Sequence, residues 1–107
     1  MKTELKFPAH LSSPSREWCE EIRAEFDLEA HSERLLVLAA GAWDQAEEAR
    51  ARLAKDGTYV EDRFGALKAH PGVAVLRDAR LSFARLVREL GIEPDHSQPN
   101  RPPKVGG

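Results

Sequence analysis

Apolar residues recur with the period of an α-helix in the first part of the chain. Trp18, Ile22 and Phe26 are spaced four residues apart, which places them on one helix face, and glutamates occupy the other side. The Ser-Ser-Pro sequence at residues 12–14 precedes this pattern, and a serine N-cap followed by proline in the first turn is a common helix start. These signals predict a helix over about residues 14–27.

The longest helical pattern covers about residues 32–56 and carries a stripe of small apolar side chains. Successive members of the stripe are three or four residues apart, so they form one line along the helix. Because alanine side chains are short, such a stripe lets a second helix approach closely. The stripe consists of Leu35, Ala39, Ala42, Ala46, Ala49 and Leu53, and Trp43 stands in a second ridge beside it.

The pattern changes after Gly57, which is placed to end the long helix. Short apolar segments at residues 59–60 and 67–68 flank a turn at residues 62–65 that closes with a glycine. This arrangement predicts a short β-hairpin, with an extended loop as the alternative. A third helix is predicted over about residues 71–90, where a proline again provides the start.

The third predicted helix has one apolar side and one basic side. Its arginines fall within about 140° of the helix circumference, opposite the apolar residues. Two interpretations stay open: the basic side is an ordinary solvated surface, or its guanidinium groups contact the phosphates of nucleic acid. On the second interpretation the candidate DNA-binding residues are Arg77, Arg80, Arg85 and Arg88 of the helix, extended by Arg63 and Lys68 of the hairpin.

Composition and charge describe a single small globular domain. The 107 residues carry 16 basic and 18 acidic side chains, a formal charge of −2, which argues against a uniformly basic coat for nucleic acid. The basic excess is local: residues 58–91 hold six basic and four acidic side chains, whereas residues 1–57 hold eight and twelve. We expect one helical core at residues 1–93, with an irregular leader at residues 1–11, followed by a flexible proline-rich tail at residues 94–107.

Signals for membranes and for catalytic chemistry are both missing from the sequence. No apolar run is long enough to span a bilayer, and the N-terminus lacks a signal-peptide core, so we expect a protein of a reducing cytosol. There is no glycine-rich phosphate loop, and the four histidines lack metal-ligand spacing. Cys19, beside Trp18 on an apolar stripe, is interpreted as a buried structural thiol. We therefore expect no enzyme activity, no cofactor and no metal.

The predicted core is thin, and this bears on assembly. Three helices and a hairpin leave Leu36, Trp43 and Tyr59 in need of cover. The alanine-rich stripe either packs against the first helix within one subunit or contacts a neighbouring subunit. We expect the second arrangement, a homo-oligomer with the stripe and Trp43 at its interface.

Several segments together resemble the small subunit of bacteriophage terminase. They read Ala-Trp-Asp-Gln-Ala at residues 42–46, Gly-Thr-Tyr-Val-Glu-Asp-Arg-Phe-Gly at residues 57–65 and Lys-Ala-His-Pro at residues 68–71. The similarity covers about residues 11–94. One departure is Gly72, where the family pattern leads us to expect alanine, and where glycine is expected to weaken the first turn of the helix.

This resemblance implies a component of the genome-packaging motor of tailed phages or prophages. In that family the small subunit forms a ring, recognises double-stranded viral DNA at the packaging start and delivers it to the large subunit. The large subunit carries the ATPase and nuclease, and the small one regulates it without being an enzyme. The resemblance thus implies action in the cytoplasm of the infected bacterial host, without a membrane partner. Arg101 and Lys104 make the tail a candidate docking peptide for the large subunit.

Two other classes stay open at this point. A small helix-turn-helix regulator would place the third helix in the major groove of DNA, but residues 57–71 form a connection far longer than the turn of that motif. An adaptor or antitoxin-like protein would not bind nucleic acid at all. Oligomer size and titration with DNA distinguish the three classes.

Overall fold

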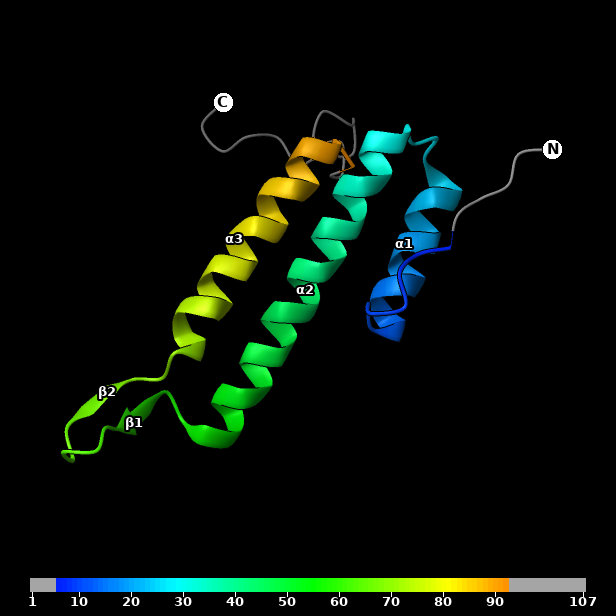
Figure 1. Ribbon diagram of the computed structural model, residues 1–107. Coiled ribbons are helices and arrows are strands. Elements are labelled where there is room, and N and C mark those ends of the chain that lie inside the picture. Colours follow the sequence, from blue (N-terminus) through cyan, green and yellow to red (C-terminus); the bar gives the residue numbers. More distant parts are fainter. Residues whose placement is uncertain (1–5, 93–107) are drawn as a thin grey trace, which may run out of the picture.

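A computed structural model describes residues 6–92, and this part of the chain forms three helices and one two-stranded hairpin (Figure 1). The elements are α1 (Ser13–Glu25), α2 (Ala30–Asp56), β1 (Tyr59–Glu61), β2 (Leu67–Ala69) and α3 (Gly72–Leu90). The mainly helical class, the long central helix and the hairpin before the last helix are confirmed. The tail predicted at residues 94–107 lies outside the described residues.

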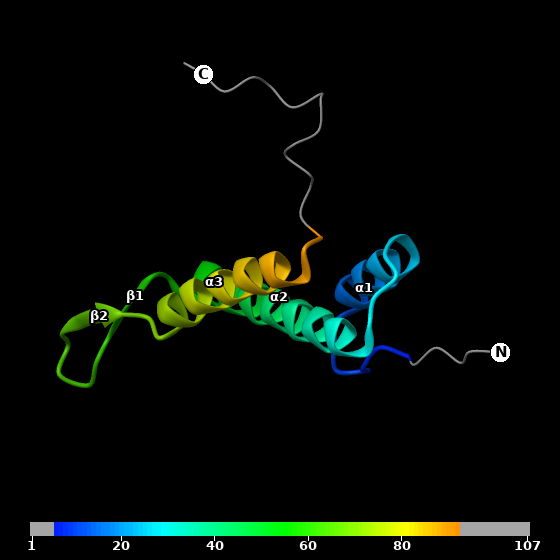
Figure 2. The same ribbon diagram turned by 90° about the horizontal axis from the view of Figure 1, so that it is seen from above.

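The long helix α2 stands in the middle of the molecule. Figure 1 shows α3 running antiparallel to α2 on one flank and the shorter α1 on the other. Seen from above in Figure 2, α1 and the C-terminal part of α3 both lie above α2. The hairpin projects beyond the ends of α2 and α3, so neither helix covers it.

Small residues build the seam between α2 and α3. Of its two neighbouring helices, α2 packs more extensively against α3. Ala42, Ala46 and Ala49 of α2 are buried, as is Ala79 of α3, and their short side chains let the two helices approach closely. The alanine-rich stripe is therefore filled from within the chain, by α3 rather than by α1.

A second core joins α1 and the leader to another face of α2. Its buried members are Phe7, Leu11, Cys19, Leu36 and Ala40, and Leu90 near the end of α3 packs against them. The expectation that Leu36 needs cover from another subunit is wrong, because Leu36 is fully buried in this core. Trp43 and Tyr59 do remain exposed, with 48% and 67% of their surface accessible.

Two polar contacts hold α1 on α2. At the start of α1, the Asp44 carboxylate accepts hydrogen bonds from the Ser12 backbone N–H (2.8 Å) and from the hydroxyls of Ser12 and Ser15 (2.6 Å each). At the other end, Arg23 donates to both carboxylate oxygens of Glu33 at 2.9 and 3.1 Å. The Ser12 hydroxyl also accepts from the Ser15 N–H, so Ser12 is the N-cap that the sequence predicted.

One aspartate fixes the hairpin turn. The Asp62 carboxylate accepts hydrogen bonds from the backbone N–H groups of Phe64 (2.8 Å) and Ala66 (3.0 Å). Gly65 has φ of 83°, a conformation that glycine adopts without steric cost. An isolated two-stranded hairpin is only marginally stable, so this element depends on its tight turn and on contacts beyond its own strands.

Candidate nucleic-acid interface

The helix α3 separates its apolar and basic side chains as the sequence predicted. Apolar residues such as Ala79 and Phe83 are buried or half-buried toward the other helices, whereas the predicted arginines are exposed. Their spacing places them together on the solvent side of the helix. We call this surface the arginine face; its residues are Arg77, Arg80, Arg85 and Arg88.

The two basic residues of the hairpin lie beyond the N-terminal end of the arginine face. Lys68 is exposed and lies opposite Val60 in the antiparallel register. Arg63 stands in the turn, with its guanidinium carbon 5.0 Å from the ring centre of Phe64. The six predicted residues are therefore distributed over two consecutive elements, four on α3 and two on the hairpin.

Counter-charges are present beside the arginine face. The Nε atom of Arg77 lies 3.3 Å from the carboxylate of Asp78, the adjacent residue on the helix. Exposed ion pairs of this kind contribute little and are easily exchanged for another anion. Phosphate oxygens can thus compete for the Arg77 guanidinium.

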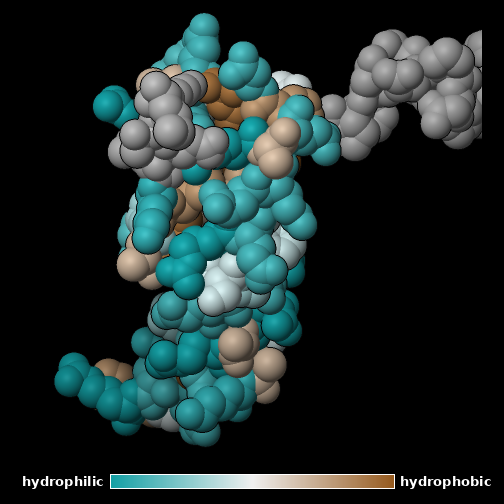
Figure 3. Space-filling model, turned by 90° about the vertical axis from the view of Figure 1, so that its right-hand side faces the viewer, coloured by the Kyte–Doolittle hydropathy of each residue, from teal (hydrophilic) through white to brown (hydrophobic). Residues whose placement is uncertain are grey.

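The side of the molecule formed by α1 has a different character. Figure 3 shows hydrophilic side chains over most of this face, with hydrophobic ones mainly in its upper half. The exposed charged residues of α1 include Glu17, Glu20, Glu21 and Glu25. Carboxylates repel phosphate, so α1 is a less favourable surface for nucleic acid than α3.

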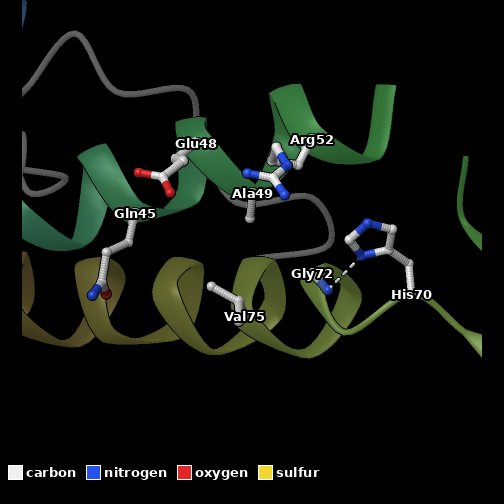
Figure 4. A pocket seen from close by; sticks show the side chains of 7 residues that line it. All are labelled: Gln45, Glu48, Ala49, Arg52, His70, Gly72 and Val75. Carbon is white, nitrogen blue, oxygen red and sulfur yellow. Dashed lines mark hydrogen bonds between the residues drawn. The ribbon is translucent and has the colours of Figure 1, made fainter. Parts of the chain in front are cut away.

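A pocket of about 320 Å³ opens at the hairpin end of the α2–α3 seam (Figure 4). Glu48 and Arg52 reach it from α2, and Val75 reaches it from α3. Because a carboxylate and a guanidinium share this opening, the pocket has no clear preference for an anion. The lining residues are Gln45, Glu48, Ala49, Arg52, His70, Gly72 and Val75.

His70 closes one side of this pocket and joins three parts of the fold. Its Nδ1 atom accepts a hydrogen bond from the Gly72 N–H at 2.8 Å, and its Nε2 atom lies 3.0 Å from the Asp56 carboxylate. An accepting Nδ1 requires the neutral tautomer with the proton on Nε2, which then donates to Asp56. The hydrogen bond from His70 lowers the pKa of Asp56, which favours its charged form.

This role of His70 was missed in the sequence, where only the following proline was used to start α3. The backbone N–H groups in the first turn of a helix need partners. A polar side chain two residues before such an N–H, as His70 is to Gly72, is the signal that could have shown it. The His70 ring is therefore a side-chain cap for α3 as well as a link to the end of α2.

The structure also explains the glycine at position 72. A Cβ atom there would lie 3.1 Å from His70 Nδ1 and 3.4 Å from Leu53 Cγ. The expectation that alanine suits this position better is therefore incomplete, since it considers only the isolated helix. Glycine lets the first turn of α3 approach both the histidine and α2.

Reactive chemistry is not assembled in the described part of the chain. Burial raises the pKa of the Cys19 thiol to about 11, so the thiol stays protonated at neutral pH. Among residues 6–92 no cluster of three or more histidine, cysteine or acidic side chains is arranged to hold a metal ion. Within the same range, no helix is long and apolar enough to cross a membrane.

The residues predicted for an oligomer interface have different environments in one subunit. Four of them, Ala39, Ala42, Ala46 and Ala49, are buried, and Leu35 and Leu53 are less fully covered. Trp43 is the member with a large exposed surface. Its ring contacts Phe83, with 5.3 Å between the ring centres.

Comparison with known proteins supplies one match. The model of a family described as phage terminase, small subunit, matches residues 16–104. This range covers most of the chain, including the three helices' shared core, the hairpin and the arginine face. Searches of curated proteins and of solved structures give no match.

Proposed function

The chain belongs to the family of phage terminase small subunits, which assigns it to the packaging of phage DNA, and we propose that it is the DNA-recognition subunit of a terminase. The family match over residues 16–104 is the observation that carries this proposal. In this role the protein binds double-stranded viral DNA at the packaging start. It assembles as a ring and regulates the large ATPase and nuclease subunit, without catalytic activity of its own, in the cytoplasm of the infected host.

The arginine face is the surface that we assign to DNA. Guanidinium groups bind phosphate oxygens bidentately and orient a protein on a duplex without reading its sequence. One subunit supplies few such contacts, so its affinity is low. A ring repeats the surface, and many weak contacts then add up to strong binding. Arg63 and Lys68 lengthen the contact surface at the hairpin end.

The connection between α2 and α3 favours this role over that of a helix-turn-helix regulator. That motif joins its two helices at a large angle through a turn of three or four residues. Here residues 57–71 contain a β-hairpin, and α3 returns antiparallel along α2. The geometry places the solvent side of α3, rather than its N-terminal tip, toward a ligand.

The experiment replaces two members of the arginine face with glutamine. Binding of a labelled mixed-sequence DNA duplex to Arg77→Gln/Arg88→Gln is measured over a range of salt concentrations. We expect weaker binding to all sequences, and a salt slope smaller by about one for each phosphate that an engaged subunit no longer neutralises. The control is Arg34→Gln/Arg50→Gln, which makes the same change of charge on α2, away from the arginine face.

The two double variants together decide the assignment. Unchanged affinity and salt slope for Arg77→Gln/Arg88→Gln would show that the arginine face is only a solvated surface. Equal reductions in both double variants would show that total charge, rather than this face, controls binding. Circular dichroism checks that both variants keep their helices.

We assign the contacts between ring subunits to the hairpin. Phe64 and Leu67 expose 80% and 71% of their surface, and the exposed Tyr59 lies on the same hairpin face as Leu67. An apolar element of two strands that no helix covers is suited to burial against a second copy. The alanine-rich stripe, in contrast, already has a partner in α3.

A further inference from the structure

Three aromatic side chains, one from each helix, meet above α2. The ring centre of Phe83 lies 5.7 Å from that of Trp18 and 5.3 Å from that of Trp43. Together with Pro14 and Ser15 they line a cavity of about 270 Å³, which we call the aromatic groove. Almost half of the Trp43 surface is accessible, so the groove is open to solvent.

The groove has the chemistry of a peptide site rather than of a small-molecule site. Its volume is just below the range of about 300–1,000 Å³ that ligand pockets occupy. The Ser15 hydroxyl in its lining is already bonded to the Asp44 carboxylate at 2.6 Å, so it offers no donor to a polar ligand. Aromatic grooves of this kind receive proline-rich segments, because a polyproline helix is preformed and loses little entropy on docking.

We propose that the aromatic groove binds the proline-rich segment of the same chain at residues 99–104. This segment reads Pro-Asn-Arg-Pro-Pro-Lys, in which the first two prolines are three residues apart. A polyproline helix has three residues per turn, so these prolines lie on one edge and can enter one groove. The family match extends to residue 104 and thus includes the whole segment.

The length of the chain allows the segment to reach the groove of its own subunit. Between Phe83 and Leu90, α3 rises by only about 11 Å. Residues 92–99 in a polyproline conformation span about 22 Å. The chain can therefore turn at the end of α3 and run back along the groove, which lies between α1 and the C-terminal part of α3 (Figure 2).

Charges around the groove match those of the segment. Glu17 and Glu21 lie one helical turn from groove residues of α1, and Glu47 lies one turn from Trp43; all three carboxylates are exposed. On α3 the corresponding neighbour is Arg80, which leaves an acidic excess. The arginine and lysine of the segment complement this excess.

Tryptophan fluorescence of the full-length chain tests the proposal, because Trp18 and Trp43 are its only tryptophans. The test variant is Pro99→Ala/Pro102→Ala/Pro103→Ala, and the matched control is Asn100→Ala in the same segment. A docked segment shields the groove from acrylamide. We expect the quenching constant to rise roughly twofold in the triple variant and to stay unchanged in the control.

A synthetic peptide of residues 97–107 supplies the second arm. Added to the triple variant, it should restore the low quenching constant, and the same peptide with its prolines replaced by alanine should not. High salt should weaken this restoration, since the charges contribute to docking. Restoration by the proline peptide alone supports the groove as its binding site.

Two results would overturn the proposal. Equal quenching in the unaltered chain and the triple variant would show that the segment does not cover the groove. Shielding that persists in the triple variant and grows with protein concentration would show that a second copy covers it instead. The assay contains neither DNA nor the large subunit, so its outcome is independent of the function proposed above.

Discussion

At the scale of single residues, Asp44 is the point at which α1 is fixed to the central helix. Three hydrogen bonds from Ser12 and Ser15 converge on its carboxylate. Burial alone would raise the pKa of Asp44, but these hydrogen bonds outweigh burial and hold its pKa below the usual value. The folded state therefore favours the charged carboxylate.

Replacing Asp44 with alanine should lower the free energy of unfolding by about 2 kcal/mol at neutral pH, because three donors lose a charged acceptor. The folded-state pKa is the lower one. The contribution is thus fully present above the unfolded-state pKa of about 3.9 and is lost as the pH falls through the folded-state pKa. Urea unfolding near neutral pH and near about pH 3 should show a smaller difference between Asp44→Ala and the unaltered chain in acid.

The control for this prediction is Asp78→Ala, which removes an exposed carboxylate that contacts the adjacent Arg77. Its effect on unfolding should be small at both pH values, as for most exposed ion pairs. A destabilisation by Asp44→Ala of the same size in acid as at neutral pH would contradict the role of the charged carboxylate.

At the scale of secondary-structure elements, local signals were sufficient to predict the fold. The Ser-Ser-Pro start of α1, the glycines after α2 and α3, and the short turn that ends at Gly65 all act within a few residues of chain. Helix and hairpin boundaries follow from such local chemistry. For this reason the observed helices differ from the predicted ones by at most two residues at either end.

The partner of each face could not be predicted in the same way. The period of α2 showed an alanine-rich side, but a period does not state whether α1, α3 or another subunit fills it. The answer depends on contacts between residues far apart in the chain, such as those that bury Ala42 and Ala79.

The candidate site shows the same division. The exposed side of α3 was predicted correctly because charge and spacing are local properties. The cap formed by His70 and the close approach at Gly72 depend on where Leu53 and Asp56 lie in space, and the sequence pattern contains no such information.

The α2–α3 seam gives a prediction at the element scale. Ala46→Leu inserts a larger side chain between closely spaced helices and should lower the free energy of unfolding by about 1–3 kcal/mol. Ala51→Leu makes the same change on an exposed side of α2 and should have little effect. Thermal unfolding of both variants measures the difference; equal stability would mean that the seam has room for a larger residue.

At the scale of the whole molecule, the exposed hairpin is the feature that bears most on assembly. Leu67→Glu places a charge in the apolar surface that we assign to subunit contacts, and an unpaired buried charge is strongly unfavourable. We expect native mass spectrometry to show a ring of more than four subunits for the unaltered chain and smaller species for this variant.

The matched control for assembly is Leu81→Glu, which makes the same substitution at an exposed position of α3. This variant should keep the ring. A Leu67→Glu protein with unchanged mass would remove the hairpin from the interface, and dissociation of both variants would point to a more extended contact surface.

The antiparallel course of α2 and α3 also sets the order in which the molecule folds. Next to the hairpin, Leu53 meets Gly72 across 19 residues of chain, whereas Leu90 joins the core around Leu36 across 54. Closing the longer loop first would cost about 1 kcal/mol more in chain entropy. The two helices should therefore close from the hairpin upward, with Leu90 arriving last.

Stopped-flow kinetics can detect this order. Leu53→Ala should mainly slow refolding, whereas Leu90→Ala should mainly speed unfolding, because its contacts form after the rate-limiting step. The opposite pattern would place the nucleus beneath α1. A chain that closes from the hairpin upward keeps that apolar hairpin uncovered from the first moment of folding, so nascent subunits can meet their neighbours before α1 is in place.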